Sequence, residues 1–300
     1  MKTRTTPPFT RSLVAVSGLF LLGLSPMKGQ SSYDPSTSQT FDQVVQGMRA
    51  LRWYNFGTQS GKTVSNLQQL ATTFNPYGIA GTTVIQQEWE RYQPFNSTNF
   101  VFQPNSLDLT ASIAGGGVYP GGITSGQIWT KETFQPGVTG YNVYGFMVRM
   151  KFPPGKGMWP GIWLYAQQGG KDDGSEIDNP EFLMMQNQNQ YDWTGFNHGP
   201  NVGADIYSIK SNPWTWRPGM DFSADYHDYE TIWTPDATYK YFDGRLVYAQ
   251  YFKYTSPGSA QLGINLAVGS NANGLPGLQP NSASEFPAVM SIQYMCIWGK

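Results

Sequence analysis

Acidic residues gather in one short stretch of the chain. Of the 20 Asp and Glu residues in the sequence, five fall within ten positions: Asp172, Asp173, Glu176, Asp178 and Glu181. The first two lie among glycines, so they fit a solvated acidic loop or a loop that binds calcium through oxygen ligands. Apolar residues precede and follow the other three, which indicates that those three lie within a β-strand.

The spacing of these three acids predicts a local irregularity in the strand. Residues two apart in a strand project from one face, so Glu176 and Asp178 share a face. Glu181 follows Glu176 by five positions and would project from the opposite face of a regular strand. Proline cannot donate a hydrogen bond to a neighbouring strand, and a single bulge residue restores the two-residue phase. We therefore expect a bulge at Asn179-Pro180 that brings all three carboxyl groups to one face.

Three carboxyl groups on one face repel one another, so the arrangement is unfavourable unless it serves chemistry. Retaining glycosidases place two carboxyl groups about 5–5.5 Å apart, one as the nucleophile and the other as the acid and then the base. A third carboxyl group between them can hydrogen-bond the nucleophile and help to keep the other group protonated. Spacing alone leaves both catalysis and a structural role open.

The rest of the sequence predicts many short strands that would position this cluster. Aromatic residues make up 15% of the chain and charged residues only 13%, while 34 Gly and 21 Pro residues suit tight turns. Asp243-Gly244 is a strong hairpin signal between Thr238–Phe242 and Arg245–Ala249. The pattern predicts an all-β sandwich or jelly roll. Further strands are expected at Thr83–Glu90, Ser106–Ile113, Ile123–Thr130, Asn142–Phe152, Gly161–Ala166, Glu176–Met184, Gln261–Val268 and Val289–Trp298.

At the N-terminus, positive residues and then a short apolar stretch follow one another in the order found in a secretory signal peptide. Lys2, Arg4 and Arg11 accompany the short apolar stretch Ser12–Ser25. That stretch is too short to span a bilayer comfortably, and no other stretch approaches the required length, so we expect no membrane association. We assign residues 1–29 to a signal peptide and expect a secreted or periplasmic protein.

Two segments follow the signal. Residues 30–77 are interpreted as a linker and N-terminal extension, with one short helix expected within Phe41–Leu51, and residues 78–300 as the main domain. Cys296 is the only cysteine, so no internal disulfide can form, and its apolar surroundings predict a core position. The net charge of -1 and the absence of a basic run disfavour a nucleic-acid partner, and we expect a monomer.

The segment Glu176-Ile-Asp178-Asn-Pro-Glu181 resembles the E-[apolar]-D-x-x-E signature of family-16 glycoside hydrolases. The resemblance implies a concanavalin-A-like jelly roll of two antiparallel sheets, retaining cleavage and no cofactor, with residues 78–300 as the catalytic domain. It implies that Glu176 is the nucleophile, Asp178 the assisting carboxylate and Glu181 the acid/base. Other segments resemble the family's strands in the same order: Thr124–Thr130 (TSGQIWT), Met158–Leu164 (MWPGIWL), His227–Asp236, Tyr241–Gly244 and Asn265–Gly269.

The spacing of two residues between Asp178 and Glu181 resembles the laminarinase, agarase and carrageenase branches of that family. A near-neutral charge argues against a heavily sulfated substrate. We expect a retaining endo-glycosidase acting on a polysaccharide, first of all a β-1,3- or mixed β-1,3/1,4-glucan. Transglycosylation, cleavage of a galactan or bacterial exopolysaccharide, a non-catalytic lectin-like protein and a structural matrix protein are the alternatives.

Aromatic side chains can bury the apolar faces of sugar rings. We expect Trp159, Trp163, Trp193 and His198 to line the substrate site, although a Trp in a sandwich is often a core residue and a lone His is often structural. The two histidines are 29 positions apart, which is not zinc-site spacing, so no metal is expected. A structural calcium ion is not predicted.

Overall fold

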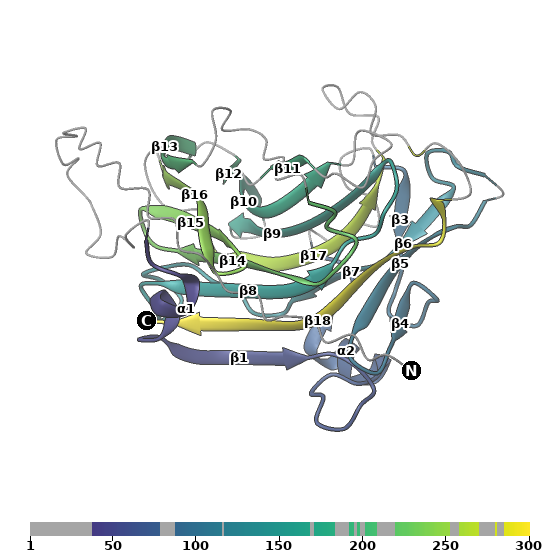
Figure 1. Ribbon diagram of the computed structural model, residues 1–300, viewed down its shortest axis with the longest axis horizontal. Helices are drawn as coiled ribbons and strands as arrows, with labels where there is room; N and C mark the ends of the chain where they lie inside the picture. The colour runs from purple at the N-terminus through teal and green to yellow at the C-terminus, as the bar shows by residue number, and fades with distance from the viewer. Residues whose placement is uncertain are drawn as a thin grey trace, which may run out of the picture. The chain divides into compact units, whose positions relative to one another are not determined.

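The computed structural model describes residues 38–78, 88–115, 117–168, 171–183, 192–194, 197–198, 202–208, 220–252, 258–269, 280 and 285–300. These residues belong to one unit, Ser31–Lys300, built from two sheets (Figure 1). Every pairing between described strands is antiparallel except that of β3 with β6. The expected fold class, an all-β jelly-roll sandwich, is confirmed.

The larger sheet, here called the outer sheet, has the strand order β13-β16-β15-β14-β8-β18-β5-β6-β3, with β1 beside β18 and β4 beside β5. Its strands are β1 (Arg49–Asn55), β3 (Glu90–Tyr92), β4 (Phe100–Phe102), β5 (Leu107–Ile113), β6 (Ile123–Ser125), β8 (Tyr144–Lys151), β13 (Val202–Ser208), β14 (His227–Trp233), β15 (Ala237–Phe242), β16 (Arg245–Phe252) and β18 (Ala288–Gly299).

The smaller sheet, here called the inner sheet, has the order β11-β10-β9-β17-β7-β2, with β12 beside β10. Its strands are β2 (Phe74–Asn75), β7 (Gln127–Thr130), β9 (Met158–Gln168), β10 (Lys171–Leu183), β11 (Asp192–Thr194), β12 (Asn197–His198) and β17 (Ala260–Val268). Segments that are distant in sequence thus become neighbours, as β17 does between β7 and β9.

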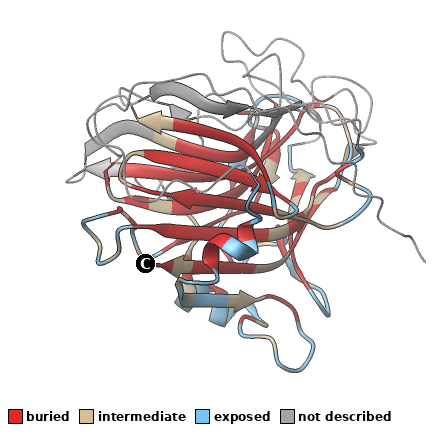
Figure 2. Cartoon of the chain, turned by 60° about the vertical axis from the view of Figure 1, so that its left-hand side comes forward, coloured by how far each residue is buried: buried red, intermediate tan, exposed pale blue. Residues whose placement is uncertain are grey.

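Apolar side chains at alternate positions of the strands build the core between the sheets. Ile162 and Leu164 of β9 belong to the same buried cluster as Phe146 and Val148 of β8. Figure 2 shows burial along most strands, whereas β1 at a sheet edge is largely exposed. The lone thiol of Cys296 is buried as expected, and burial raises its pKa to about 12.

The predicted hairpin is confirmed between β15 and β16. Asp243 has φ 46° and Gly244 has φ 77°. Two consecutive residues with positive φ match the right-handed twist of the flanking strands, which explains the Asp-Gly sequence. Another expected strand, Ile123–Thr130, is divided at Gly126 into β6 of the outer sheet and β7 of the inner sheet. The expected strand Thr83–Glu90 lies mostly outside the described residues.

The N-terminal extension reaches both sheets. Its first helix, α1, covers Phe41–Val45, which lies within the range Phe41–Leu51 where one short helix is expected. The helix begins with a capping box between Thr40 and Gln43. The chain after it continues into β1, whose backbone groups find their hydrogen-bond partners in β18. A second helix, α2 (Leu67–Thr73), leads into β2, which pairs with β7.

Candidate active site

The register between β10 and β9 contains the expected bulge. Asp178 lies opposite Trp163, but Glu181 lies opposite Gly161, so three residues of β10 span the length of two on β9. The register shift falls at Asn179-Pro180, whose peptide bond is cis. The bulge predicted from the proline and from the spacing of the acids is confirmed.

The bulge keeps three acidic positions in one phase. Directly opposed residues of an antiparallel pair project from the same face. Glu176 lies opposite Tyr165 and Asp178 opposite Trp163, so both acids occupy the face of β10 that points away from the sandwich core. Ile177, between them, is in the core. The backbone of Glu181 is in the same phase as these two acids, and its side chain lies outside the described part of the chain.

The two described carboxylates differ in exposure. Asp178 is only 2% exposed, whereas Glu176 is partly accessible. A buried acid next to a more accessible one gives the pair different environments, which is how neighbouring carboxyl groups take different roles. The loop expected at Asp172 and Asp173 is wrong, because pairing with β9 makes both residues part of the backbone of β10, which begins at Lys171 and not at Glu176. Their side chains lie outside the described part.

An aromatic group lies beside the acids on the same face. Trp163 is 8% exposed and contacts Trp129 with ring centroids 4.8 Å apart, and Tyr165 at 5.5 Å. These three rings form a buried cluster separate from the sandwich core. Gly263 of β17 lies between Trp163 and Trp129, and a Cβ there would be 2.6 Å from the indole of Trp129. A glycine is therefore required for the indole to lie over the sheet.

A buried polar chain holds Trp163 in place. The Trp163 Nε1 donates to Asn265 Oδ1 at 3.0 Å, and Asn265 Nδ2 donates to the Tyr92 hydroxyl at 2.8 Å. That hydroxyl donates to Glu88 Oε2 at 3.1 Å. Burial raises the pKa of the neighbouring Glu90, whose Oε2 accepts from the Val268 N–H. The sequence interpretation missed this chain, although the alternation Glu88-x-Glu90-x-Tyr92 offers a signal for it.

The comparisons with known proteins start from the family model. Residues 94–266, more than half of the chain, match glycosyl hydrolases family 16. The chain belongs to this family. The extension described above, which runs to β2, precedes the matched region.

Curated relatives of this family-16 chain include two glucanases. The glucan endo-1,3-beta-glucosidase A1 of Niallia circulans is 26% identical over 162 residues, which are 50% of this chain and 23% of that protein. The glucan endo-1,3-beta-glucosidase of Cryptopygus antarcticus is 26% identical over 193 residues, which are 59% of this chain and 67% of that protein. A keratan-sulfate endo-1,4-beta-galactosidase of Sphingobacterium multivorum is 28% identical over 163 residues, 50% of this chain and 35% of that protein.

Solved structures share the fold of this family-16 chain. The endo-beta-1,3-glucanase from Pyrococcus furiosus superposes with a TM-score of 0.61 at 23% identity, covering 84% of this chain and 94% of that one. SCLam, a non-specific endo-beta-1,3(4)-glucanase, gives a TM-score of 0.61 at 19% identity, covering 84% and 91%. At these identities the likeness concerns the fold.

The other expected site residues of the family-16 chain are placed by register. Trp159 lies on the same face of β9 as Trp163 and is buried. In β12, His198 is opposite Glu176, and in β11, Trp193 is opposite Phe182, one position out of phase with Glu181. The side chains of Trp193 and His198 lie outside the described part. The roles of all these residues therefore stay predictions.

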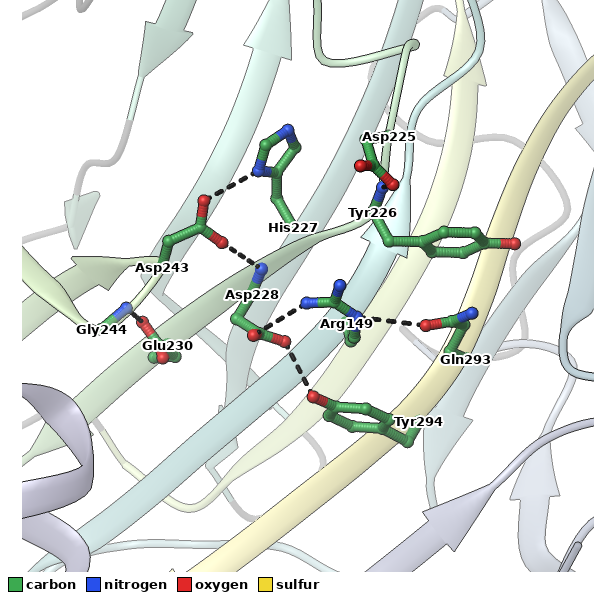
Figure 3. Close-up of polar contacts among 10 residues, drawn as sticks. All are labelled: Arg149, Asp225, Tyr226, His227, Asp228, Glu230, Asp243, Gly244, Gln293 and Tyr294. Carbon is green, nitrogen blue, oxygen red and sulfur yellow. Dashed lines mark hydrogen bonds and ion pairs between the residues drawn. The ribbon is translucent and has the colours of Figure 1, made fainter. Parts of the chain in front are cut away.

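A second group of acids lies on the outer sheet (Figure 3). Asp228 Oδ2 pairs with Arg149 at 2.9 Å, and its Oδ1 accepts from the Tyr294 hydroxyl at 3.0 Å. Glu230 Oε2 accepts from the Gly244 N–H at 3.0 Å. These partners come from the protein itself, so the group has a structural role. Burial raises the pKa of Glu230 to about 9, and the charges of Asp228 and nearby acids add to this.

Within the described part of the chain, no three His, Cys, Asp or Glu side chains lie close enough together to hold a metal ion. None of the described helices has the length and apolar character needed to cross a membrane.

Proposed function

We propose that this family-16 protein is a retaining endo-hydrolase of a β-1,3- or mixed β-1,3/1,4-glucan. The observation that carries the proposal is the bulge between Asp178 and Glu181, which keeps three acidic positions of β10 in one phase. A strand that served only as structure would have no need for three like charges on one face.

The reaction would be a double displacement. Glu181 donates its proton to the glycosidic oxygen, while the Glu176 carboxylate attacks the anomeric carbon from the opposite side. The leaving sugar departs with that proton, and a glycosyl ester of Glu176 remains. Glu181, now a carboxylate, takes a proton from water as the water oxygen attacks the anomeric carbon. Two inversions at that carbon return the β-configuration and regenerate both carboxyl groups.

Asp178 would assist the two groups that react. It lies two residues from Glu176 on the same face and is almost fully buried. A carboxyl group in this position can hydrogen-bond the nucleophile, and its charge helps to keep the acid/base protonated before bond cleavage.

The aromatic group beside the acids supports a sugar substrate. Trp163 and Tyr165 lie on β9 opposite Asp178 and Glu176 and keep exposed fractions of 8% and 9%, whereas Trp129, on β7, is fully buried and can only support the ring of Trp163. Indole rings bury the apolar face of a pyranose well. The glucanase relatives favour a glucan, while the galactosidase relative makes a galactan the second candidate. A transglycosylase, or a lectin-like protein on the same fold, would bind the same sugars without net hydrolysis.

The test is incubation of purified protein with laminarin, barley β-glucan, agarose, carrageenan and keratan sulfate, with NMR of the fresh products. We expect shortening of a glucan and initial release of the β-anomer. Initial release of the α-anomer would exclude double displacement. Sugar binding without shortening of any of these polymers would favour the lectin-like alternative.

We also propose that residues 1–29 direct export and are removed. The order of positive residues followed by a short apolar stretch supports this proposal. Mass spectrometry of the protein secreted by an expressing cell should give a chain that begins near residue 30, and recovery of the full chain from the cytoplasm alone would contradict it.

A further inference from the structure

The bulge that positions the acids contains a polar side chain turned into the sandwich. Asn179 is 2% exposed and lies on the core side of β10, opposite to the face of Glu176 and Asp178. Its Nδ2 donates to the backbone carbonyl of Glu230 and, at 2.9 Å, to Thr231 Oγ1. Both acceptors belong to β14 of the outer sheet, so one amide group connects the two sheets at the bulge.

The surroundings of this amide are otherwise apolar. Asn179 and Thr231 lie in the space between the sheets at this point. Most of the other side chains that line this space are hydrophobic, among them Phe146, Val148, Ile162, Leu164, Ile177 and Leu262. A buried amide that lacks hydrogen bonds costs about 1–3 kcal/mol. Asn179 therefore stabilises only those arrangements in which its Nδ2 meets the acceptors on β14.

The orientation of the amide follows from its partners. The carbonyl of Glu230 can only accept a hydrogen bond, so it must face Nδ2. Asn179 Oδ1 is buried and has no hydrogen-bond donor among the described residues. An apolar side chain of similar volume would fill this space without that unsatisfied oxygen, so the asparagine is not the most favourable choice for packing alone.

The hydrogen bonds determine which residue of the bulge is the inserted one. With Asn179 directed into the core, Pro180 is the extra residue and the position of Glu181 returns to the face of Glu176. A bulge displaced by one residue would reverse the phase of the strand after it. The contacts of Asn179 with β14 oppose such a displacement, because an apolar residue at that position would lose both hydrogen bonds across the sandwich.

We propose that Asn179 is a positioning residue, whose bonds across the sandwich to β14 hold the bulge and thereby place Glu181 relative to Glu176. For its kinetic consequences this inference rests on the proposed function. It concerns a residue that touches neither the substrate nor the reacting atoms.

The test compares Asn179→Leu with Ile177→Ala, a control on the same strand and the same buried face. Thermal unfolding confirms that each variant is folded, and kcat and KM are then measured on laminarin across pH. In Asn179→Leu we expect kcat to fall by roughly 10–100-fold, since small misplacements of reacting groups have effects of this size. We expect KM to change by less than about twofold. The basic limb of the kcat profile should shift, because it depends on how Glu181 is held.

A merely structural role predicts a different result. Asn179→Leu would then lose stability as Ile177→Ala does, but keep the wild-type kcat and pH profile, and this outcome would overturn the proposal. If Asn179→Leu does not fold, Thr231→Val decides, because it removes one acceptor and leaves the amide in place. We expect a fall in kcat of roughly threefold for the loss of one hydrogen bond, and an unchanged kcat and pH profile would again overturn the proposal.

The failure of this inference differs from failure of the proposed function. If Glu176→Gln and Glu181→Gln are inactive while Asn179→Leu behaves as the wild type, only the role of Asn179 is wrong. If those two variants keep their activity, the proposed function itself fails.

Discussion

Two strands of the molecule carry acids at the same spacing, Glu176-x-Asp178 on β10 and Asp228-x-Glu230 on β14. Each pair occupies one face of its strand and points away from the core between the sheets. On β10 a bulge brings a third acidic position, Glu181, into the same phase. On β14 the strand is regular and no third acid follows in phase. The i, i+2 spacing of acids is therefore not in itself a sign of catalysis.

The partners of the β14 pair explain its role. Asp228 is held by Arg149 and the Tyr294 hydroxyl (Figure 3). Glu230 is only 3% exposed, and burial raises its pKa to about 9, so it is protonated at neutral pH. Asp243, unlike Glu230, keeps its charge. Burial opposes that charge, but hydrogen bonds from His227 and the Asp228 N–H lower the pKa of Asp243 overall. This group stabilises the outer sheet and leaves no free acid for chemistry.

The strongest test of the comparison removes the charge of each proposed catalytic acid. We expect Glu176→Gln and Glu181→Gln each to lower kcat on laminarin by roughly 10³-fold or more, because each removes a group that reacts. Circular dichroism and binding of laminarin should remain close to wild type. Turnover near the wild-type rate in either variant would contradict the assignment and remove the distinction between the two strands.

The next largest effect concerns the buried acid of β14. The pKa of Glu230 is about 9 in the folded protein, whereas the ordinary pKa of a Glu side chain is 4.5. Between these values the unfolded state loses its proton first, so the free energy of unfolding falls as pH rises, by up to about 1.4 kcal/mol per pH unit. The loss levels off above the folded-state pKa. Below pH 4.5 both states are protonated and the group has no effect.

Glu230→Gln keeps an acceptor for the Gly244 N–H but cannot ionise. We expect its stability to vary less with pH than that of the wild type, so that the variant gains relative stability between pH 5 and pH 8. Urea unfolding of both proteins at several pH values measures this. Parallel curves would show that Glu230 titrates alike in the folded and unfolded states.

A smaller effect should follow from Asp228→Asn, which breaks the ion pair with Arg149 on the outer sheet. Both side chains are partly exposed, so we expect a loss of only about 1 kcal/mol in the free energy of unfolding. We expect kcat on laminarin to stay within about twofold of wild type. A large loss of kcat in a folded Asp228→Asn protein would give the β14 acids a part in the reaction.

The smallest expected effect is a change in KM, and it distinguishes the tryptophans that lie beside the two pairs of acids on β10 and β14. Trp163 adjoins Asp178 and donates to Asn265, whereas Trp53 is 51% exposed and stacks on Tyr294 at 5.7 Å. We expect Trp163→Phe to raise KM for laminarin about fivefold, because ring area and a hydrogen bond are lost near the sugar. Trp53→Phe should leave KM unchanged. Equal effects of the two substitutions would argue that Trp163 lies outside the substrate site.

The sequence by itself determined the features that depend on neighbouring residues. The Asp243-Gly244 turn follows from residues that tolerate positive φ, and the bulge at Asn179-Pro180 follows from proline and the two-residue period of a strand. The same local logic assigned Asp172 and Asp173 to a loop, but pairing with β9 extends β10 back to Lys171. Where the local signal was weak, as over Phe41–Leu51, the one expected short helix forms at Phe41–Val45, and pairing with β18 makes the residues from Arg49 a strand.

Only the tertiary structure decided which distant residues meet. The contact of Asn179 with β14 joins residues 51 and 52 positions apart, and the bond from Asn265 to Tyr92 spans 173 positions. No local pattern encodes such contacts, because they depend on the order of strands in two packed sheets. The same order paired Asp228 with Arg149 and buried Glu230, whose raised pKa keeps it protonated at neutral pH. Packing, and not spacing, thus separates the acids that support the fold from those proposed to react.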